Sequence, residues 1–376
     1  MQTAAYYFPN FHVDPLNEAV HGPGWTEWEL MKCARPRYPG HDQPKVPLWG
    51  YGDEADPAVM AQKIEAAADH GLDAFIFDWY WYDQPFLERA LTQGYLQAPN
   101  RYRLKFALMW ANHDWRNFHP ASRTQPYPVS HVVKTTLATV GQVWDYIIDN
   151  FMLRSEYWRV DGKPYFSIYA MNRFIIQMGG VQAAAEAIAL LREKACRAGL
   201  PGVYISTIWF DVLEGHPNCS ECPQTDWFHK IGIDCYTSYN NTNINKAWFT
   251  ENMQVDYDAN SQAYLQMCRK AISTLPAPYY PVLTVGWDSS PRTVQSEVYE
   301  CNKVGYPYIP FMVSTPESFG RAIDDTLALL AEQPENRRLL FINAWNEWTE
   351  GSYLEPDTKY GMAFLQELKK RLSARA

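Results

Sequence analysis

The chain has 376 residues, enough for one large domain or two of ordinary size. Apolar residues make up 47% of it and charged residues 20%, proportions typical of a globular protein with a sizeable core. The formal net charge of −9 and the lack of a dense basic stretch argue against a nucleic-acid partner or a membrane-surface patch.

Eight short apolar, β-branched or aromatic runs alternate with longer amphipathic segments along the chain. Each run is nearly continuous in its apolar character, as expected of parallel strands that are buried on both faces. In chain order the predicted strands are Ala4–Phe8, Ala74–Trp79, Lys105–Trp110, Pro164–Tyr169, Val203–Trp209, Ile233–Ser238, Pro281–Trp287 and Leu339–Trp345.

The segments between these runs have the periodicity of helices. The first helix begins at Pro57 after the N-cap candidate Asp56, and it ends near Gly71. The further predicted helices are Val181–Ala198, Ser261–Thr274, Ser318–Ala331 and Gly361–Leu372.

Eight strand–helix alternations in a chain of this length predict a single α/β domain over residues 1–376, folded as a (β/α)₈ TIM barrel. A doubly wound open sheet is the alternative, although no glycine-rich phosphate loop follows the first strand. The segment Asn10–Asp53 is then a long first βα loop, which we expect to fold over the catalytic face.

In such a barrel the active site lies at the carboxyl ends of the strands. Aromatic rings there can take the C–H face of a pyranose while polar groups take its hydroxyls, so the pattern predicts a sugar pocket. The candidates at or near the strand ends are His12, Asp78, Trp110, Asn112, His113, Tyr236, Trp287, Asp288, Trp345 and Asn346. Packing or purely structural roles remain open for several of them.

The long first loop holds a second acidic constellation. Glu27 lies between Trp25 and Trp28, which suggests a lid or subsite element. The alternative is a surface loop whose tryptophans fill a small satellite core.

Glu347 and Glu350 form the strongest catalytic candidate. On a helical turn their Cβ atoms would lie roughly 5–6 Å apart, on one face. Glycosidases use two carboxyl groups, ~5–5.5 Å apart when they retain the anomeric configuration and ~6.5–9.5 Å apart when they invert it. Glu-x-x-Glu is also common on solvated helices, so the neighbouring Trp345, Asn346 and Trp348 at a strand end give the pair its weight.

The motifs around these residues resemble glycoside hydrolase family 99, the endo-α-mannosidase and endo-α-mannanase group. The closer resemblance is to the family-99-like WbsX-type group of lipopolysaccharide-biosynthesis proteins, and it covers the chain from Tyr6 to about Leu372. The motifs that carry it are Tyr6–His12, Gly24–Trp28, Gly40–Pro44, Trp110–Asn112, Val160–Pro164, Trp287-Asp288 with Pro291-Arg292, Phe341–Gly351 and Leu354–Asp357.

This resemblance adds Tyr7 and Arg292 to the expected substrate contacts and implies a retaining glycoside hydrolase. Glu347 would act as general base on the sugar 2-hydroxyl, whose oxygen attacks the anomeric carbon and gives a 1,2-anhydro sugar. Glu350 would protonate the leaving group and later activate water. The route needs O2 trans to the leaving group, as in α-linked manno-configured glycans of mannose or rhamnose type.

Two positions depart from the related patterns. Thr349 stands where family 99 usually has His, and His113-Asp114 stands where many WbsX-type relatives have Glu-Asn. The resemblance therefore does not imply mannan specificity. A glycosyltransferase of surface-polysaccharide biosynthesis and a non-catalytic carbohydrate-binding barrel are the alternatives, although no Asp-x-Asp nucleotide-sugar motif is convincing.

The remaining expectations concern partners and compartment. We expect an oligosaccharide or polysaccharide substrate, no nucleic acid, no cofactor, no metal, no membrane span, and a monomer or small homo-oligomer. The N-terminus has no signal-peptide pattern and the seven cysteines are an odd number, which favours the cytoplasm; a removed leader would make the protein periplasmic or secreted. For Cys219 and Cys222, a loop pair without metal, a disulfide and a zinc site are all open.

Overall fold

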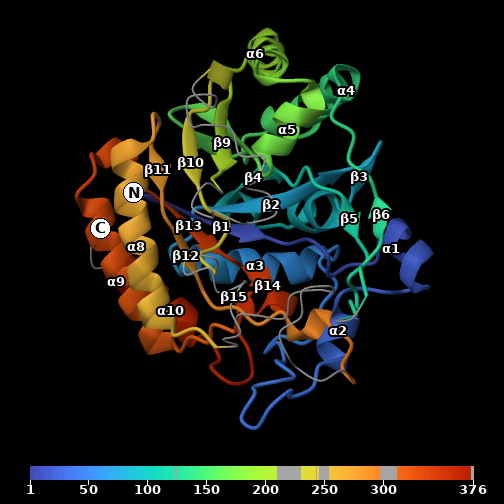
Figure 1. The fold of residues 1–376 in the computed structure, drawn as a ribbon, viewed down its shortest axis with the longest axis vertical. Coiled ribbons are helices and arrows are strands. Elements are labelled where there is room, and N and C mark those ends of the chain that lie inside the picture. Colours follow the sequence, from blue (N-terminus) through green and yellow to red (C-terminus); the bar gives the residue numbers. More distant parts are fainter. Residues whose placement is uncertain (123–124, 210–229, 243, 245–253, 297–310, 374–376) are drawn as a thin grey trace.

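A computed structural model describes residues 1–122, 125–209, 230–242, 244, 254–296 and 311–373 of the chain. Within these residues a nearly closed parallel sheet lies at the centre and helices surround it (Figure 1). The predicted single α/β barrel is therefore confirmed.

In the described part of the chain, nine strands follow one another around the sheet in the order β11-β10-β9-β8-β4-β2-β1-β13-β12. They are β1 (Gln2–Tyr7), β2 (Ala74–Trp81), β4 (Lys105–Trp110), β8 (Lys163–Ile168), β9 (Tyr204–Ile208), β10 (Cys235–Thr237), β11 (Tyr279–Tyr280), β12 (Val282–Thr284) and β13 (Leu339–Asn343). Six short strands lie off this path: β3 (Pro85–Phe86), β5 (Trp115–Arg116), β6 (Val129–His131), β7 (Arg159–Val160), β14 (Asn346–Glu347) and β15 (Ser352–Tyr353).

The seventh predicted strand is divided at Pro281. β11 pairs with β10 and β12 pairs with β13, so the two pieces join the edges of the sheet and close the barrel. Proline has no N–H to give to a ladder, which interrupts the strand at this point. Its carbonyl oxygen still accepts a hydrogen bond from the N–H of Phe341 at 3.1 Å. The strand thus begins and ends earlier than the predicted Pro281–Trp287.

The five predicted helices are all present, and four further helices accompany them. The nine helices of the described residues are α1 (Pro15–His21), α2 (Trp28–Cys33), α3 (Pro57–Asp69), α4 (Leu137–Ile147), α5 (Met171–Met178), α6 (Val181–Arg197), α8 (Tyr257–Thr274), α9 (Pro316–Ala331) and α10 (Ala363–Ser373). In Figure 1, α8, α9 and α10 stand together on one side of the barrel.

The predicted long first βα connection is present, and it contains two short helices, α1 and α2. The Asp14 side chain accepts a hydrogen bond from the N–H of Leu16 at 2.8 Å, and Pro15 follows it at the first helical position. Asp56 and Pro57 begin α3 in the same way. The same N-cap signal was therefore present at both places.

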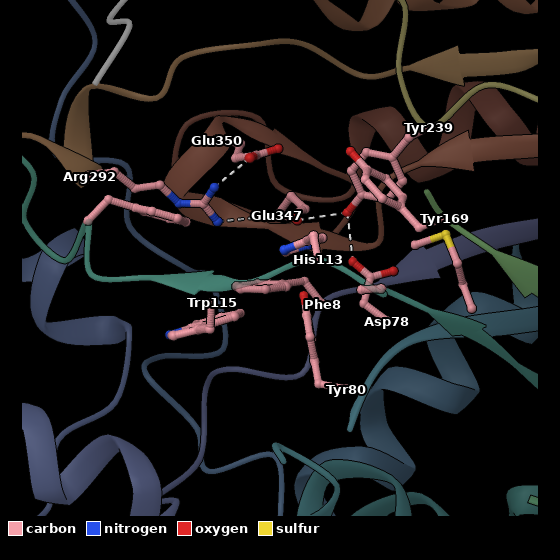
Figure 2. Close-up of a pocket in the computed structure, with 13 residues that line it drawn as sticks. Phe8, Asp78, Tyr80, His113, Trp115, Tyr169, Tyr239, Arg292, Glu347 and Glu350 are labelled. Carbon is pink, nitrogen blue, oxygen red and sulfur yellow. Dashed lines mark hydrogen bonds and ion pairs between the residues drawn. The ribbon is translucent and has the colours of Figure 1, made fainter. Parts of the chain in front are cut away.

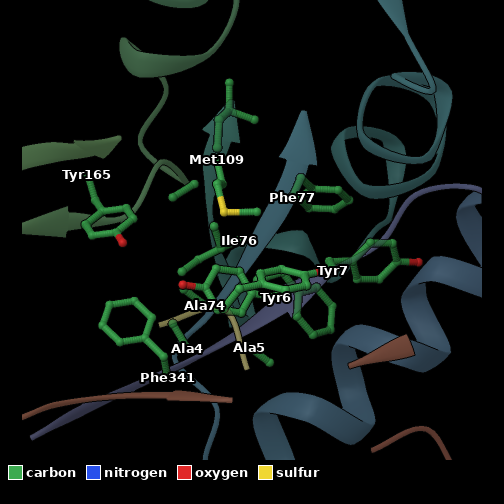
Figure 3. Packing of buried hydrophobic residues seen from close by; sticks show 14 of the residues in the cluster. Ala4, Ala5, Tyr6, Tyr7, Ala74, Ile76, Phe77, Met109, Tyr165 and Phe341 are labelled. Atoms are coloured by element: carbon green, nitrogen blue, oxygen red, sulfur yellow. The ribbon is translucent and has the colours of Figure 1, made fainter. Parts of the chain in front are cut away.

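Alternation along the strands decides which side chains face the barrel interior (Figure 3). Tyr6 packs inside against Phe341, with ring centroids 6.1 Å apart. Its neighbour Tyr7 points to the other side and packs against Phe77 at 4.6 Å. These aromatic layers fill the barrel below the site.

Two further expectations concerned a membrane-spanning helix and the pair Cys219 and Cys222. Among the described residues, no single helix is long and apolar enough to cross a membrane; α5 and α6 reach that threshold only as a pair bent by 105°. Cys219 and Cys222 lie outside the described residues.

Gly94 marks a close backbone approach that a larger residue cannot make. A Cβ atom at Gly94 would lie 2.0 Å from the backbone carbonyl oxygen of Glu54, whereas one at Gly141, inside α4, would meet nothing within 4 Å. We predict that Gly94→Ala lowers the free energy of unfolding by about 1–3 kcal/mol or more through overpacking. The control Gly141→Ala should raise it by up to about 1 kcal/mol through helix propensity. Urea denaturation of both variants tests this, and equal effects would contradict the close approach.

Candidate active site

A pocket of about 110 Å³ opens where the carboxyl ends of the strands meet (Figure 2). Aromatic rings and carboxyl groups share its wall, as predicted for a sugar pocket. Its lining residues are Phe8, Asp78, Tyr80, Met109, Ala111, His113, Trp115, Phe118, Tyr169, Tyr239, Arg292, Glu347 and Glu350.

Arg292 links the acidic residues of the pocket. Its Nη2 donates to Glu347 Oε2 at 3.1 Å, and its Nη1 donates to Glu350 Oε1. Its Nε lies 3.2 Å from Glu27 Oε1 and donates to the Thr349 hydroxyl at 2.8 Å. One buried guanidinium group thus serves three carboxyl groups that come from distant parts of the chain.

Two rings hold the same guanidinium group in place. The Arg292 Cζ atom lies 5.4 Å from the ring centroid of Phe8 and 5.2 Å from that of Phe118. Cation–π attraction and exclusion of water strengthen the ion pairs at this point.

The two candidate catalytic carboxyl groups are both hard to ionise. Burial raises the pKa of Glu347 well above its ordinary value, and the charge of Glu350 raises it further. Burial also raises the pKa of Glu350, while Arg292 opposes both increases. Glu350 Oε2 has no hydrogen-bond partner among the described residues. Such a pair shares its protons, which suits groups that give and take them near neutral pH.

Glu27 is the permanent counter-ion of Arg292. Burial opposes its ionisation, yet the charges of Arg292 and His119 lower the pKa of Glu27 to about 2. Asn10 Nδ2 donates to Glu27 Oε2 at 2.5 Å, and the Thr349 hydroxyl donates to Oε1. Glu27 is fully buried and does not line the pocket, to which Arg292 connects it.

A second buried ionic cluster lies outside the pocket wall. Lys63 Nζ in α3 lies 2.7 Å from Glu54 Oε1 and 2.6 Å from Glu355 Oε1. The Tyr7 hydroxyl donates to Glu54 Oε1 at 2.7 Å. These side chains are all buried, so Lys63 supplies the positive charge that pairs with Glu54 and Glu355.

This cluster fixes the residues on both sides of Glu347. Trp345 Nε1 and Trp348 Nε1 donate to the two oxygens of Glu355, at 2.9 and 2.6 Å. Asn346 binds the backbone of Phe8, directly after β1, through the oxygen and the nitrogen of its side-chain amide. The short segment that carries Glu347 is therefore tied down at each neighbour, which holds its carboxyl group in the pocket.

Asp288 anchors the other side of the site. The Arg37 N–H donates to His41 Nδ1 at 3.0 Å, so His41 carries its proton on Nε2 and donates it to Asp288 Oδ2 at 2.9 Å. Burial opposes ionisation of Asp288, yet the hydrogen bond from His41 and the charge of Lys45 lower its pKa to about 2. The Asp288 N–H donates to the Glu350 carbonyl oxygen at 2.6 Å, which fixes the turn that carries Glu350.

Five of the predicted site residues line the pocket together. They are Asp78, His113, Arg292, Glu347 and Glu350. His113 Nδ1 donates to the Asp114 carbonyl oxygen at 3.1 Å, and burial lowers the pKa of His113. Its neutral imidazole therefore offers Nε2 as an acceptor.

The predicted aromatic contacts lie outside the pocket. They are Tyr7, Trp28, Trp110, Tyr236, Trp287 and Trp345, and all are buried. Strand alternation explains Trp110: its neighbour Met109 lines the pocket, so Trp110 faces outward and packs against Trp144 at 5.8 Å. Trp28 instead packs on Trp348, with ring centroids 5.8 Å apart.

The remaining polar candidates also lie outside the lining, and all but His12 hydrogen-bond the backbone or other side chains. They are His12, Glu27, Asn112, Asp288 and Asn346. Asn112 exchanges two hydrogen bonds with the backbone of Ala170. Burial lowers the pKa of His12 to about 3, so His12 is a neutral side chain of the interior.

Eight lining residues were not among the predicted contacts. They are Phe8, Tyr80, Met109, Ala111, Trp115, Phe118, Tyr169 and Tyr239. Tyr80 follows Asp78 by two residues on β2, so alternation alone would have indicated it. Tyr169 directly follows β8 and Tyr239 lies two residues after the end of β10, whereas Phe118 lies in a long connection that gives no such signal.

The fold defines the class: an α/β barrel of the kind found in glycoside hydrolases. The GH99 endo-α-mannosidase of Bacteroides thetaiotaomicron superposes with a TM-score of 0.59 at 14% identity, covering 99% of this chain and 97% of that chain. A β-glucosidase of Thermotoga maritima superposes with a TM-score of 0.51 at 10% identity, covering 98% and 97%. At these identities the likeness concerns the fold alone.

The chain belongs to the family described as glycosyltransferase WbsX, whose family model matches residues 3–368. The resemblance inferred from the motifs is thereby confirmed. Two curated relatives, each described as uncharacterized protein WxcX of Xanthomonas campestris pv. campestris, are 28% identical over 379 residues. The match covers 98% of this chain and 49% of each relative, so the chain spans about half the length of the curated relatives it matches.

The Lys63 cluster gives a stability prediction. We predict that Lys63→Met lowers the free energy of unfolding by about 3–5 kcal/mol, because Glu54 and Glu355 would remain buried without their cation. The control is Lys32→Met, which removes an ion pair to Glu29 whose side chains are 44% and 48% exposed. That change should cost less than about 1 kcal/mol. Chemical denaturation of both variants measures the difference, and a Lys63 variant as stable as the control would contradict the charge balance described.

Proposed function

We propose that this chain is a glycoside hydrolase that cleaves an α-linked, manno-configured glycan with retention through a 1,2-anhydro sugar. The observation that carries the proposal is the pair Glu347 and Glu350, held on one guanidinium group in one pocket. The shared guanidinium group keeps the two carboxyl groups close to each other. The barrel likeness to an endo-α-mannosidase is in keeping with this reading.

In the first step Glu347 takes the proton of the sugar 2-hydroxyl, and O2 forms a bond to the anomeric carbon. The bond from that carbon to the leaving oxygen breaks, and Glu350 gives its proton to this oxygen. Arg292 stabilises whichever carboxyl group is charged, because it touches both.

In the second step water attacks the anomeric carbon and the bond to O2 breaks. Glu350, now ionised, takes a proton from the water, and Glu347 returns its proton to O2. Both carboxyl groups end as they began, and two displacements at one carbon give net retention.

The charge of the pocket favours a neutral glycan. Among the described lining residues, Arg292 supplies the positive charge, and it is already bonded to three carboxyl groups. An anionic ligand would meet the negative charges of the same cluster in a site of low dielectric. The aromatic wall suits the C–H faces of sugar rings.

The family description favours a second candidate, a glycosyltransferase of surface-polysaccharide biosynthesis. A transferase would bind a nucleoside diphosphate sugar, and its site would need cationic side chains or a metal ion to balance the charge of the phosphates. Calorimetric titration with a panel of nucleotide sugars separates the two candidates. We expect no binding to any of them, and tight binding of one would favour the transferase.

We predict that Glu347→Gln and Glu350→Gln each lower kcat on unactivated α-mannosyl or α-L-rhamnosyl oligosaccharides by about 10²–10⁴-fold, the usual contribution of general acid–base groups. Glu350→Gln should lose less in the first step on an activated aryl glycoside, whose leaving group needs no proton. Product release by chromatography and the burst of aryl alcohol measure the two effects.

The matched control is Glu88→Gln, a carboxyl group outside the pocket that accepts hydrogen bonds from Trp79 and Tyr146. Its activity should stay close to that of the unchanged protein. Sugar binding without turnover, and with no effect of Glu347→Gln, would instead indicate a non-catalytic carbohydrate-binding barrel.

A further inference from the structure

The hydroxyl of Tyr239 lies between two carboxyl groups of the pocket. Its oxygen is 2.8 Å from Asp78 Oδ2 and 2.8 Å from Glu347 Oε1 (Figure 2). A phenol has one hydrogen and can donate it to only one of these oxygens. If both carboxyl groups were ionised, the other contact would bring two buried oxygens together without a hydrogen between them. One of the two carboxyl groups therefore carries a proton and donates it to Tyr239.

The surroundings decide which of the two carries the proton. Glu347 Oε2 accepts a hydrogen bond from Arg292, so a charge on Glu347 is stabilised. Asp78 Oδ1 has no hydrogen-bond partner among the described residues, although Asp78 is only 4% exposed. An ionised Asp78 would leave a charged oxygen buried and unpaired, whereas a neutral acid leaves only a carbonyl oxygen there.

The groups around Asp78 act in both directions, and the net effect favours its neutral form. Burial raises the pKa of Asp78 well above its ordinary value, although the hydrogen bond from Tyr239 lowers it. Tyr6 of β1 and Tyr80 of β2 are neutral neighbours, since burial raises the pKa of both. Arg292 favours ionisation of Asp78, but its hydrogen bonds go to other carboxyl groups.

We propose that Asp78 is a neutral carboxylic acid in the resting protein, and that its hydrogen bond to the Tyr239 oxygen directs the tyrosine hydrogen to Glu347 and keeps Glu347 ionised. Asp78 is then a positioning residue that acts through Tyr239. The two carboxyl groups hold one proton between them at rest. They hold two once Glu347 has taken the proton of the 2-hydroxyl, so Asp78 gives up none of its own during turnover.

The protonation itself does not depend on the proposed function and is tested without substrate. Infrared difference spectra at neutral pH compare the unchanged protein with Asp78→Asn and with Glu347→Gln. We expect a carboxylic-acid carbonyl band that disappears in Asp78→Asn and persists in Glu347→Gln. Glu350 is protonated in all three proteins, so its band cancels in the difference spectra. Spectra in which Asp78→Asn removes no carbonyl band, or in which only Glu347→Gln removes one, would overturn the proposal.

The consequence for catalysis rests on the proposed hydrolase activity and is tested separately. Asp78→Ala should lower kcat by roughly 10-fold or more with a smaller change in KM, because Glu347 loses its oriented hydrogen bond. Asp78→Asn should rescue most of that loss, because its amide N–H donates to Tyr239 as the neutral acid does. It should also extend activity to higher pH, since the group that deprotonates there is gone. An Asp78→Asn variant as impaired as Asp78→Ala would overturn this role, even where the infrared band agrees.

Discussion

The guanidinium group of Arg292 is the charge on which the site depends. Glu27 comes from the first βα connection, and Glu347 and Glu350 follow the last strand, so two distant segments bring three carboxyl groups to one cation. Bringing carboxylates out of water is costly, and a shared, well-oriented partner offsets that cost. The depressed pKa of Glu27 and the raised pKa of Glu347 express the same constraint: one positive charge cannot satisfy all three equally.

A second buried ionic cluster, outside the lining of the pocket, holds the segment that carries Glu347. Lys63, Glu54 and Glu355 form a buried cluster whose oxygens receive the indole N–H groups of Trp345 and Trp348. The aromatic and amide residues that surround the candidate catalytic pair are therefore part of its support. Because these residues are buried, the groups available for chemistry are a few carboxyl groups whose positions are fixed in advance.

The barrel could be predicted from sequence because its strands are continuous apolar runs and several helices begin with clear caps. Gly-free segments of apolar and aromatic residues, such as the run through Phe75 and Phe77, have one plausible role in such a fold. Pro281 shows the limit, since only the closure of the sheet reveals that both sides of the proline belong to one strand.

The site was harder to predict, since sequence position does not give the direction of a side chain. Trp110 and Asn112 stand at a strand end but face the helices or the backbone, whereas Met109 and Tyr239 reach the pocket. Two-residue alternation would have corrected part of this. Glu27 contacts Arg292, and Lys63 contacts Glu355. The partners in each pair lie more than two hundred residues apart in the sequence, so no local pattern indicates these roles.

The central claim is that Glu347 and Glu350 perform hydrolysis with participation of the sugar 2-hydroxyl. Time-resolved proton NMR of the first product from an α-mannosyl or α-L-rhamnosyl oligosaccharide tests it most directly. The account predicts that the α anomer appears first and equilibrates later. A first product with the inverted β configuration would contradict it.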